Sequence, residues 1–158
     1  MTKQVKIGNV VIGGGNPVAI QSMANIKTSK IDDVVRQIAE LEVLGCDIIR
    51  VSVKDDDDVK ALSEIKKRIS IPLVADIHFN YKYALKAIDS GVDKIRINPG
   101  NIGSEKNVEE VARALIHSDV AVRVGSNSGS IEKEFLAKYG RSEVSLAESA
   151  LKNVAALE

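Results

Sequence analysis

The chain has 158 residues, of which 44% are hydrophobic and 28% charged. This composition is typical of one soluble globular domain and excludes a disordered or fibrous chain. Lys and Arg together number 22, as do Asp and Glu, so bulk electrostatics gives no reason to expect a nucleic-acid or membrane partner. No apolar run approaches the roughly 20 residues of a membrane span, and the first ten residues lack the apolar core of a secretory signal. We therefore expect a cytoplasmic protein.

Residues 1–17 predict a β-hairpin. Two short β-type runs flank Gly8-Asn9, a dipeptide typical of a tight turn. Gly13, Gly14 and Gly15 follow. Three glycines can suggest a phosphate cradle, but no lysine of a phosphate-binding loop and no helix come directly after them. A turn toward the next strand is the simpler interpretation.

Strands and amphipathic helices alternate through the rest of the chain. Strands are predicted at 18–23, 47–53, 71–78, 93–100 and 121–127. Helices are predicted after each of them, the first with Ser29 and Asp32 as a capping pair and Gly45 as its end. Asp55 to Asp58 open the second helix, where acids complement the helix dipole, and this explains the acidic run more simply than a metal site.

This alternation predicts an α/β protein with a parallel sheet covered by helices. The main body has five predicted strands, whereas a closed (β/α)8 barrel needs eight and about 250 residues. The pattern therefore leaves two alternatives open, an open doubly wound sheet and a partial (β/α)8 barrel. In either case residues 1–158 form a single domain, with the hairpin in 1–17 and the βα units in 18–158.

Four successive strands carry polar residues on one face, toward their carboxyl ends. Side chains alternate between the two faces of a strand, so the polar residues share one face and the apolar residues the other. The polar residues are Arg50, Asp76, His78, Arg96, Asn98 and Arg123, with Asn127 just past the last strand. Ligands of parallel α/β proteins bind at that end of the sheet. We interpret the set as a candidate binding site.

Three arginines on one interior face need negative partners, because a buried unpaired charge is costly. Asp76 is the only acid in the set, and a bound polyanion would supply the missing negative charge, since guanidinium groups bind phosphate oxygens with paired hydrogen bonds. The alternative is that the arginines reach the rim and pair with water or loop acids. His78 is a candidate for binding a phosphate or hydroxyl oxygen or for general acid catalysis, and Asp76 is a second catalytic candidate or a structural partner of an arginine.

Some residues are predicted to have no chemical role or an open one. Gly100 and Gly103 either let backbone amides approach a ligand or only turn the chain. His117 is expected on the surface. Cys46 is the only cysteine, so no internal disulfide is possible, and we expect it buried before a strand. No metal-ligand spacing is present, and we expect no metal site.

Several long motifs resemble one family. The segments AIQSM, LGCDIIRVSV, VADIHFNYKYALKAIDSGVDKIRINPGNIG and VRVGSNSGSIEKEFLAKYG closely resemble (E)-4-hydroxy-3-methylbut-2-enyl diphosphate synthases of the non-mevalonate isoprenoid pathway. The likeness covers essentially the whole chain. The loop ANIKTSK departs from the threonine-rich loop of the family.

The resemblance implies a TIM-type barrel and an oxidoreductase. Members reductively open and dehydrate 2-C-methyl-D-erythritol 2,4-cyclodiphosphate with two electrons from ferredoxin or flavodoxin. A separate C-terminal domain holds a 4Fe-4S cluster with three cysteines and a glutamate, and dimers place the partner's cluster domain over the barrel mouth. The family's substrate-binding positions correspond to Arg50, Asp76, His78, Arg96, Asn98, Arg123 and Asn127.

The resemblance also implies that this chain is incomplete. It stops near the point where a sixth barrel strand is expected, and the cluster cysteines are absent, so we expect a shortened or natural fragment that holds no cluster and has no redox activity by itself. Unpaired sheet edges favour a homo-oligomer over a monomer. Two further interpretations stay open: another anion-binding barrel similar to dihydropteroate synthase, and a non-catalytic phosphate-binding fragment.

Overall fold

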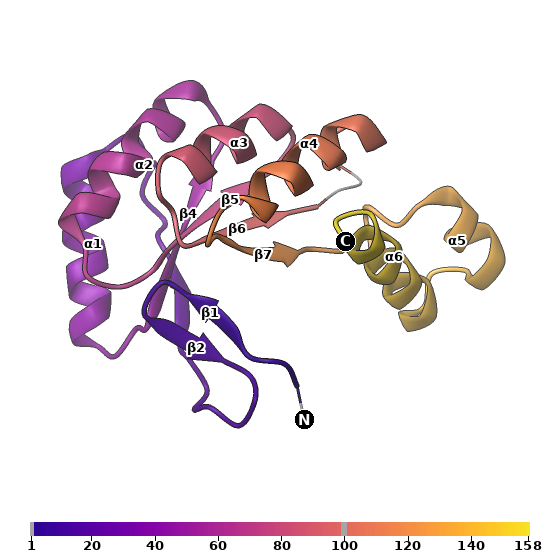
Figure 1. Ribbon diagram of the computed structural model, residues 1–158, viewed down its shortest axis with the longest axis horizontal. Coiled ribbons are helices and arrows are strands. Elements are labelled where there is room, and N and C mark those ends of the chain that lie inside the picture. The colour runs from indigo at the N-terminus through magenta and orange to yellow at the C-terminus, as the bar shows by residue number, and fades with distance from the viewer. Residues whose placement is uncertain (1, 99–100) are drawn as a thin grey trace.

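The computed structural model describes residues 2–98 and 101–158. After an N-terminal hairpin its strands and helices alternate along the chain (Figure 1). The strands are Val5–Ile7 (β1), Val10–Ile12 (β2), Gln21–Met23 (β3), Ile48–Val53 (β4), Leu73–Ile77 (β5), Lys94–Ile97 (β6) and Ala121–Val124 (β7). The helices are Ile31–Val43 (α1), Asp56–Arg68 (α2), Tyr81–Asp89 (α3), Glu105–Ile116 (α4), Lys133–Tyr139 (α5) and Glu143–Ala155 (α6).

The main sheet has the winding of a barrel. Its strands follow the order β3-β4-β5-β6-β7, and every neighbouring pair is parallel. A doubly wound sheet reverses its strand order at a switch point, whereas a (β/α)8 barrel adds each strand beside the previous one. Helices α1 to α4 also lie together on one face of the sheet (Figure 1). The described strands therefore form part of a (β/α)8 barrel, and the doubly wound alternative is excluded.

The outer face of the sheet packs on these helices. Ile49 and Val51 of β4, Ala75 of β5 and Ile95 of β6 are fully buried there. They meet the apolar stripes of the helices, which include the fully buried Val34, Ile38, Leu62, Ile65 and Val111. Burying a branched aliphatic side chain contributes roughly 1.5–3 kcal/mol, so this layer fixes which face of each strand points outward.

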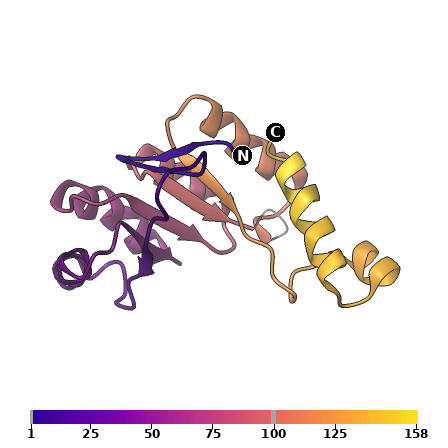
Figure 2. The same ribbon diagram turned by 90° about the horizontal axis from the view of Figure 1, so that it is seen from below.

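The hairpin covers the lower part of the opposite, inner face. β1 and β2 pair antiparallel around Gly8-Asn9, as predicted. Ile7 is fully buried and packs with Ile48 and Val74, the first inward residues of β4 and β5. Figure 2 shows the hairpin lying across the sheet, while α5 and α6 stand beyond β7, away from the other helices. The inner face is therefore closed by apolar residues at its amino end and left open toward its carboxyl end.

Two predictions about the first βα unit were wrong. The strand predicted at 18–23 is limited to Gln21–Met23, because only these residues pair with β4, and Val18 is 93% exposed. Ser29 and Asp32 do not cap α1. The cap position is Lys30, without a side-chain hydrogen bond, because the Ser29 amide donates instead to Asp58 at 3.0 Å and Asp32 pairs with Arg68 at 2.7 Å.

The triple glycine forms a turn. Gly13, Gly14 and Gly15 all have positive φ, a region that residues with a Cβ atom rarely adopt. The Asn16 amide donates to the Gly13 carbonyl at 3.0 Å, and the Gly14 amide donates to the Thr2 hydroxyl at 3.1 Å. Backbone geometry explains this run without a bound phosphate.

Three smaller observations concern predictions made from the sequence. Cys46 is buried and His117 exposed, as expected. Asp55 caps α2 by accepting from the Asp58 amide at 2.9 Å. Across the parts of the chain that the structure describes, no helix combines the length and apolar character needed to cross a membrane.

Candidate anion-binding site

One row of polar side chains crosses four strands on the inner face. The register pairs Ser52 with Asp76, Asp76 with Arg96, and Arg96 with Arg123. Because partners in register point to the same face, all four side chains share the interior side of the sheet. Arg50 lies on that face two residues before Ser52. The strands themselves thus bring three guanidinium groups and one carboxylate together.

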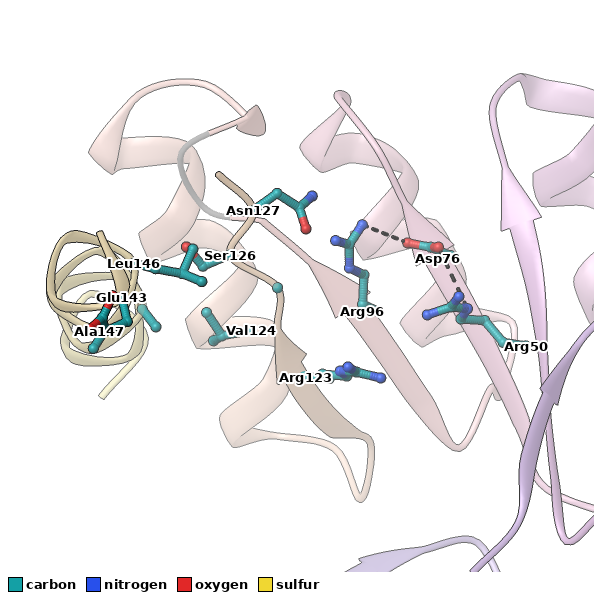
Figure 3. A pocket seen from close by; sticks show the side chains of 12 residues that line it. Arg50, Asp76, Arg96, Arg123, Val124, Ser126, Asn127, Glu143, Leu146 and Ala147 are labelled. Carbon is teal, nitrogen blue, oxygen red and sulfur yellow. Dashed lines mark hydrogen bonds and ion pairs between the residues drawn. The ribbon is translucent and has the colours of Figure 1, made fainter. Parts of the chain in front are cut away.

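Asp76 joins two of the arginines. Its Oδ1 lies 3.1 Å from Nη1 of Arg96, and its Oδ2 lies 3.7 Å from Nε of Arg50 (Figure 3). The Asp76 side chain is 5% exposed, whereas those of Arg50 and Arg96 are 25% and 16% exposed. One buried carboxylate is thus shared by two guanidinium groups, and this pairing orients both arginines from one side.

The positive charge of this cluster exceeds the negative charge. Within residues 2–98 and 101–158, Arg123 makes no ion pair, and its residue is exposed because β7 is a sheet edge. Arg50 Nε is buried and has no hydrogen-bond acceptor among the described residues. Arg50 Nη2 donates to the thioether of Met23 at 3.1 Å, which is a weak acceptor. The cluster therefore offers donors that protein groups do not use.

These arginines line one cavity of about 590 Å³. Its other walls are Asp76, the segment from Val124 to Asn127, and residues of α6. Figure 3 shows Arg50 and Arg96 meeting at Asp76, with Arg123 on the neighbouring strand and Asn127 beyond the end of β7. Arg50, Asp76, Arg96, Arg123 and Asn127, five of the seven predicted site residues, therefore share a single cavity.

Gly125 makes room for the Arg96 guanidinium. A Cβ atom at this position would lie 2.5 Å from Nε and 2.6 Å from Nη2 of Arg96. The Gly125 amide donates to the Ile97 carbonyl at 2.7 Å, which extends the β6–β7 pairing by one step. Sequence reasoning did not single out this glycine, because its function depends on a contact across strands.

The two remaining predicted residues lie beside the cavity. Asn98 is buried, and its amide donates to the Ser130 hydroxyl at 2.8 Å. The same hydroxyl donates to the Asn127 carbonyl at 3.1 Å and accepts from the Asn127 amide at 3.3 Å. Asn98 thus fixes the loop that carries Asn127. Gly103 has a φ of 113°, which suits a turn, and Gly100 lies outside the described residues.

His78 faces a different part of the inner surface. Its Nε2 lies 3.2 Å from the Ser52 hydroxyl, and it lines two neighbouring cavities of about 530 and 470 Å³. The first of these lies under the segment from Met23 to Thr28 and also contains Lys54, Asp55 and Asp58. His78 is therefore next to the arginine cluster but is not part of its cavity.

Lys94 is a further cation that the sequence analysis missed. It lies on the inner face of β6, two residues before Arg96, is 7% exposed, and donates to the Gln21 side chain at 2.7 Å. Burial lowers the pKa of Lys94, and the positive charges of Arg123 and Arg50 lower it further. Strand alternation alone would have found it, since it has the same parity as Arg96.

The residues present do not fit an iron-sulfur cluster. Such clusters are held mainly by several cysteine thiolates, and the sequence contains only Cys46, whose thiol is buried against the Ile48 carbonyl at 3.1 Å. The described part of the chain also has no group of three or more His, Cys, Asp or Glu side chains placed to hold a metal ion. No chemical step at this site can be assigned to such a group.

The fold and the site together define a class of protein, a (β/α)8-type barrel with a cluster of arginine side chains on its inner surface. Residues 2–158 match the model of the GcpE TIM-barrel domain, and the chain belongs to this family. It is 52% identical over its full length to the 4-hydroxy-3-methylbut-2-en-1-yl diphosphate synthase (flavodoxin) of Caldanaerobacter subterraneus subsp. tengcongensis. It is 53% identical over its full length to the synthase of the same name from Caldicellulosiruptor saccharolyticus.

The chain spans less than half the length of these relatives. It covers 45% of the first and 46% of the second. Among solved structures, the dihydropteroate synthase of Yersinia pestis superposes with a TM-score of 0.65 over 97% of this chain and 58% of that one, at 12% sequence identity. That of Thermus thermophilus has a TM-score of 0.60 at 13% identity and covers 98% of this chain and 61% of that one. At such low identity the likeness shows the barrel fold alone.

Proposed function

We propose that this chain is the substrate-binding part of a 4-hydroxy-3-methylbut-2-en-1-yl diphosphate synthase and that its arginine cluster binds the phosphates of a cyclic diphosphate substrate. The observation that carries the proposal is the imbalance of charge: three arginines, Arg50, Arg96 and Arg123, line one cavity with two acids, Asp76 on β5 and Glu143 on α6. A diphosphate supplies the missing negative charge and the acceptors that Arg50 lacks.

The expected substrate is 2-C-methyl-D-erythritol 2,4-cyclodiphosphate. In the proposed complex Arg50, Arg96 and Arg123 bind phosphate oxygens, and Asn127 donates an amide hydrogen bond from the end of β7. Asp76 pairs with two of the guanidinium groups and orients them before the ligand arrives. Preorganised donors of this kind stabilise an anion without reorganising when it binds. His78 and Asn98 complete the site, the first near the hydroxyl-bearing part of the ligand and the second by fixing the loop of Asn127.

The complete enzyme reductively opens and dehydrates this ring, and its relatives' name supports flavodoxin as the electron donor. A 4Fe-4S cluster, which would supply electrons in the complete enzyme, has no set of cysteine ligands in this chain, and we expect the chain by itself to bind substrate without turning it over. We also propose that the protein is cytoplasmic and forms a homo-oligomer, as expected from the sequence.

Isothermal titration calorimetry with the cyclodiphosphate tests the proposal. The parent chain is expected to bind it, and Arg96→Ala to abolish the heat of binding, because the variant loses the guanidinium at the centre of the row. Arg113→Ala is the matched control, since Arg113 lies exposed on α4 and pairs with Glu109 at 3.5 Å. Absence of binding by the parent chain, or equal binding by Arg96→Ala, would falsify the assignment.

A further inference from the structure

His78 lies directly after the end of β5, where the sheet hydrogen bonds no longer fix the backbone. β5 ends at Ile77, whose register partner is Val53, and the last residue of β5 that pairs with β6 is Asp76. His78 follows outside the ladder and is partly exposed. The β5 ladder therefore does not fix the orientation of this side chain, which lines the two cavities next to the arginine cluster.

Ser52 is a fixed neighbour of this imidazole. It lies in β4, which pairs with β3 on one side and β5 on the other. Its carbonyl also accepts from the hydroxyl of Thr28 at 2.6 Å, and Thr28 is 1% exposed. The Ser52 hydroxyl, 3.2 Å from Nε2 of His78, thus belongs to a residue whose backbone is held by β5 and by Thr28.

Asp76 is not available to orient the His78 imidazole. It is a carboxylate on the same face, two residues before His78, and Ser52 is its register partner. Both of its oxygens are directed to arginines, at 3.1 Å from Arg96 and 3.7 Å from Arg50. Within the described residues, the Ser52 hydroxyl is the hydrogen-bond partner of the His78 ring.

We propose that Ser52 is a positioning residue, which holds Nε2 of His78 and so directs the other ring nitrogen, Nδ1, toward the ligand. A single neutral hydrogen bond of ordinary strength favours one orientation about fivefold, and it also selects how the ring proton is distributed between the two nitrogens. The assignment of a ligand to Nδ1 rests on the proposed function, whereas the contact between Ser52 and His78 does not.

Imidazole ¹⁵N NMR on the free chain tests the positioning directly. The chain has only two histidines, so a His117→Gln variant assigns both rings. In Ser52→Ala the ¹⁵N shifts of His78 are expected to move toward those of a solvated imidazole, while those of His117 do not change. Ser22→Ala is the matched control on the neighbouring strand, because Ser22 pairs with Ile49 and so shares the outer face. Unchanged His78 signals in Ser52→Ala would overturn the proposal.

A second pair of variants separates the hydroxyl from the volume of the side chain. Ser52→Thr keeps the hydroxyl and is expected to restore the parent signals of His78, whereas Ser52→Val has nearly the same shape and is expected to behave like Ser52→Ala. This pair also decides the matter if Ser52→Ala does not fold. Equal His78 signals in the threonine and valine variants would overturn the role of the hydroxyl.

Ligand titration distinguishes this inference from the proposed function. Ser52→Ala is expected to weaken binding of the cyclodiphosphate about fivefold and to leave binding of inorganic diphosphate unchanged, because the latter contacts only the arginine cluster. If the NMR change occurs but the parent chain binds neither compound, the proposed function fails and the positioning role stands. Equal weakening for both compounds would overturn the link between Ser52 and the hydroxyl-bearing part of the ligand.

Discussion

At the scale of single residues, the absence of a side chain can be as specific as its presence. Gly125 leaves the space that the Arg96 guanidinium occupies, and a Cβ atom there would lie within 3 Å of three guanidinium atoms. The atoms that would have to move form the far end of a flexible side chain, so the strand itself need not shift. A substitution at Gly125 therefore acts on the position of a charge and not on the fold.

Gly125→Ala is expected to weaken binding of diphosphate roughly tenfold or more, since a charge-assisted hydrogen bond is worth about 1.5–3 kcal/mol. Its melting temperature is expected to remain close to that of the parent chain. Gly129→Ala is the control, because a Cβ atom at Gly129 meets no atom within 4 Å. Calorimetric titration of the three proteins with inorganic diphosphate decides the matter, and equal affinities would show that Arg96 does not need this space.

Lys94 adds a second residue-scale prediction, which concerns stability. Its pKa in the folded chain is lowered from the ordinary 10.5 by burial and then by Arg123 and Arg50. Below the folded pKa the amine is charged in both states, so the cost of burying the charge acts at full strength. Above 10.5 it is neutral in both states and the cost is gone. Stability therefore rises with pH between these two values.

Lys94→Met removes this cost and leaves the half-buried Gln21 amide able to turn to water. The variant is expected to be more stable than the parent chain at pH 7, and its advantage is expected to shrink as the pH rises toward 10.5. Urea unfolding of both proteins at pH 7 and pH 10 measures the difference, in which the other lysines cancel. An advantage that stays constant with pH would contradict the assigned cause.

At the scale of elements, Asp58 connects two loops at the carboxyl end of the sheet. It lies in the first turn of α2 and is 2% exposed. It accepts from the Ser29 amide at 3.0 Å and from the Lys54 amide at 3.1 Å. The loop before α1 and the loop after β4 therefore share one acceptor, which places the first loop over Ser52 and His78.

Asp58→Asn is expected to destabilise the chain by about 2 kcal/mol, because the amide nitrogen cannot accept and one buried backbone N–H loses its partner. Asp57→Asn, in the same turn but exposed and paired with Lys60 at 3.2 Å, is the control. Hydrogen exchange is expected to become faster in residues 24–30 of Asp58→Asn only. Unaltered exchange in that loop would show that Asp58 is not what holds it.

The same scale shows what sequence patterns can predict. Strand alternation correctly placed Arg50, Arg96 and Arg123 on one face, because the side-chain period of two does not depend on distant contacts. Lys94 obeys the same rule and was overlooked. The roles of Gly125 and Ser130 depend on how β6, β7 and the following loop meet. The predicted cap of α1 was wrong because the Ser29 amide donates to Asp58, 29 residues away. Local periodicity predicts faces, whereas contacts between loops require the folded chain.

At the scale of the whole molecule, the sheet ends in two open edges. Among the described strands β3 pairs only with β4, and β7 pairs only with β6. The free edge of β7 adjoins an apolar groove of about 410 Å³ between the hairpin, β7 and α6. Val122 of β7 and Val5 of β1 are 38% and 42% exposed beside it. Unpaired backbone groups next to apolar side chains favour pairing with another chain.

We therefore expect the chain to self-associate as its concentration rises, with the edge of β7 in the contact. Val122→Lys is expected to reduce the association, because a charged side chain on an edge strand opposes pairing and the position is exposed enough for a lysine to reach water. Val43→Lys adds the same charge at the end of α1, where Val43 is 87% exposed, so it controls for net charge and should leave the edge contact intact. Light scattering over a concentration series measures the mass of each protein. A parent chain that stays monomeric at high concentration would contradict the prediction, and equal association by Val122→Lys would place the contact elsewhere than on β7.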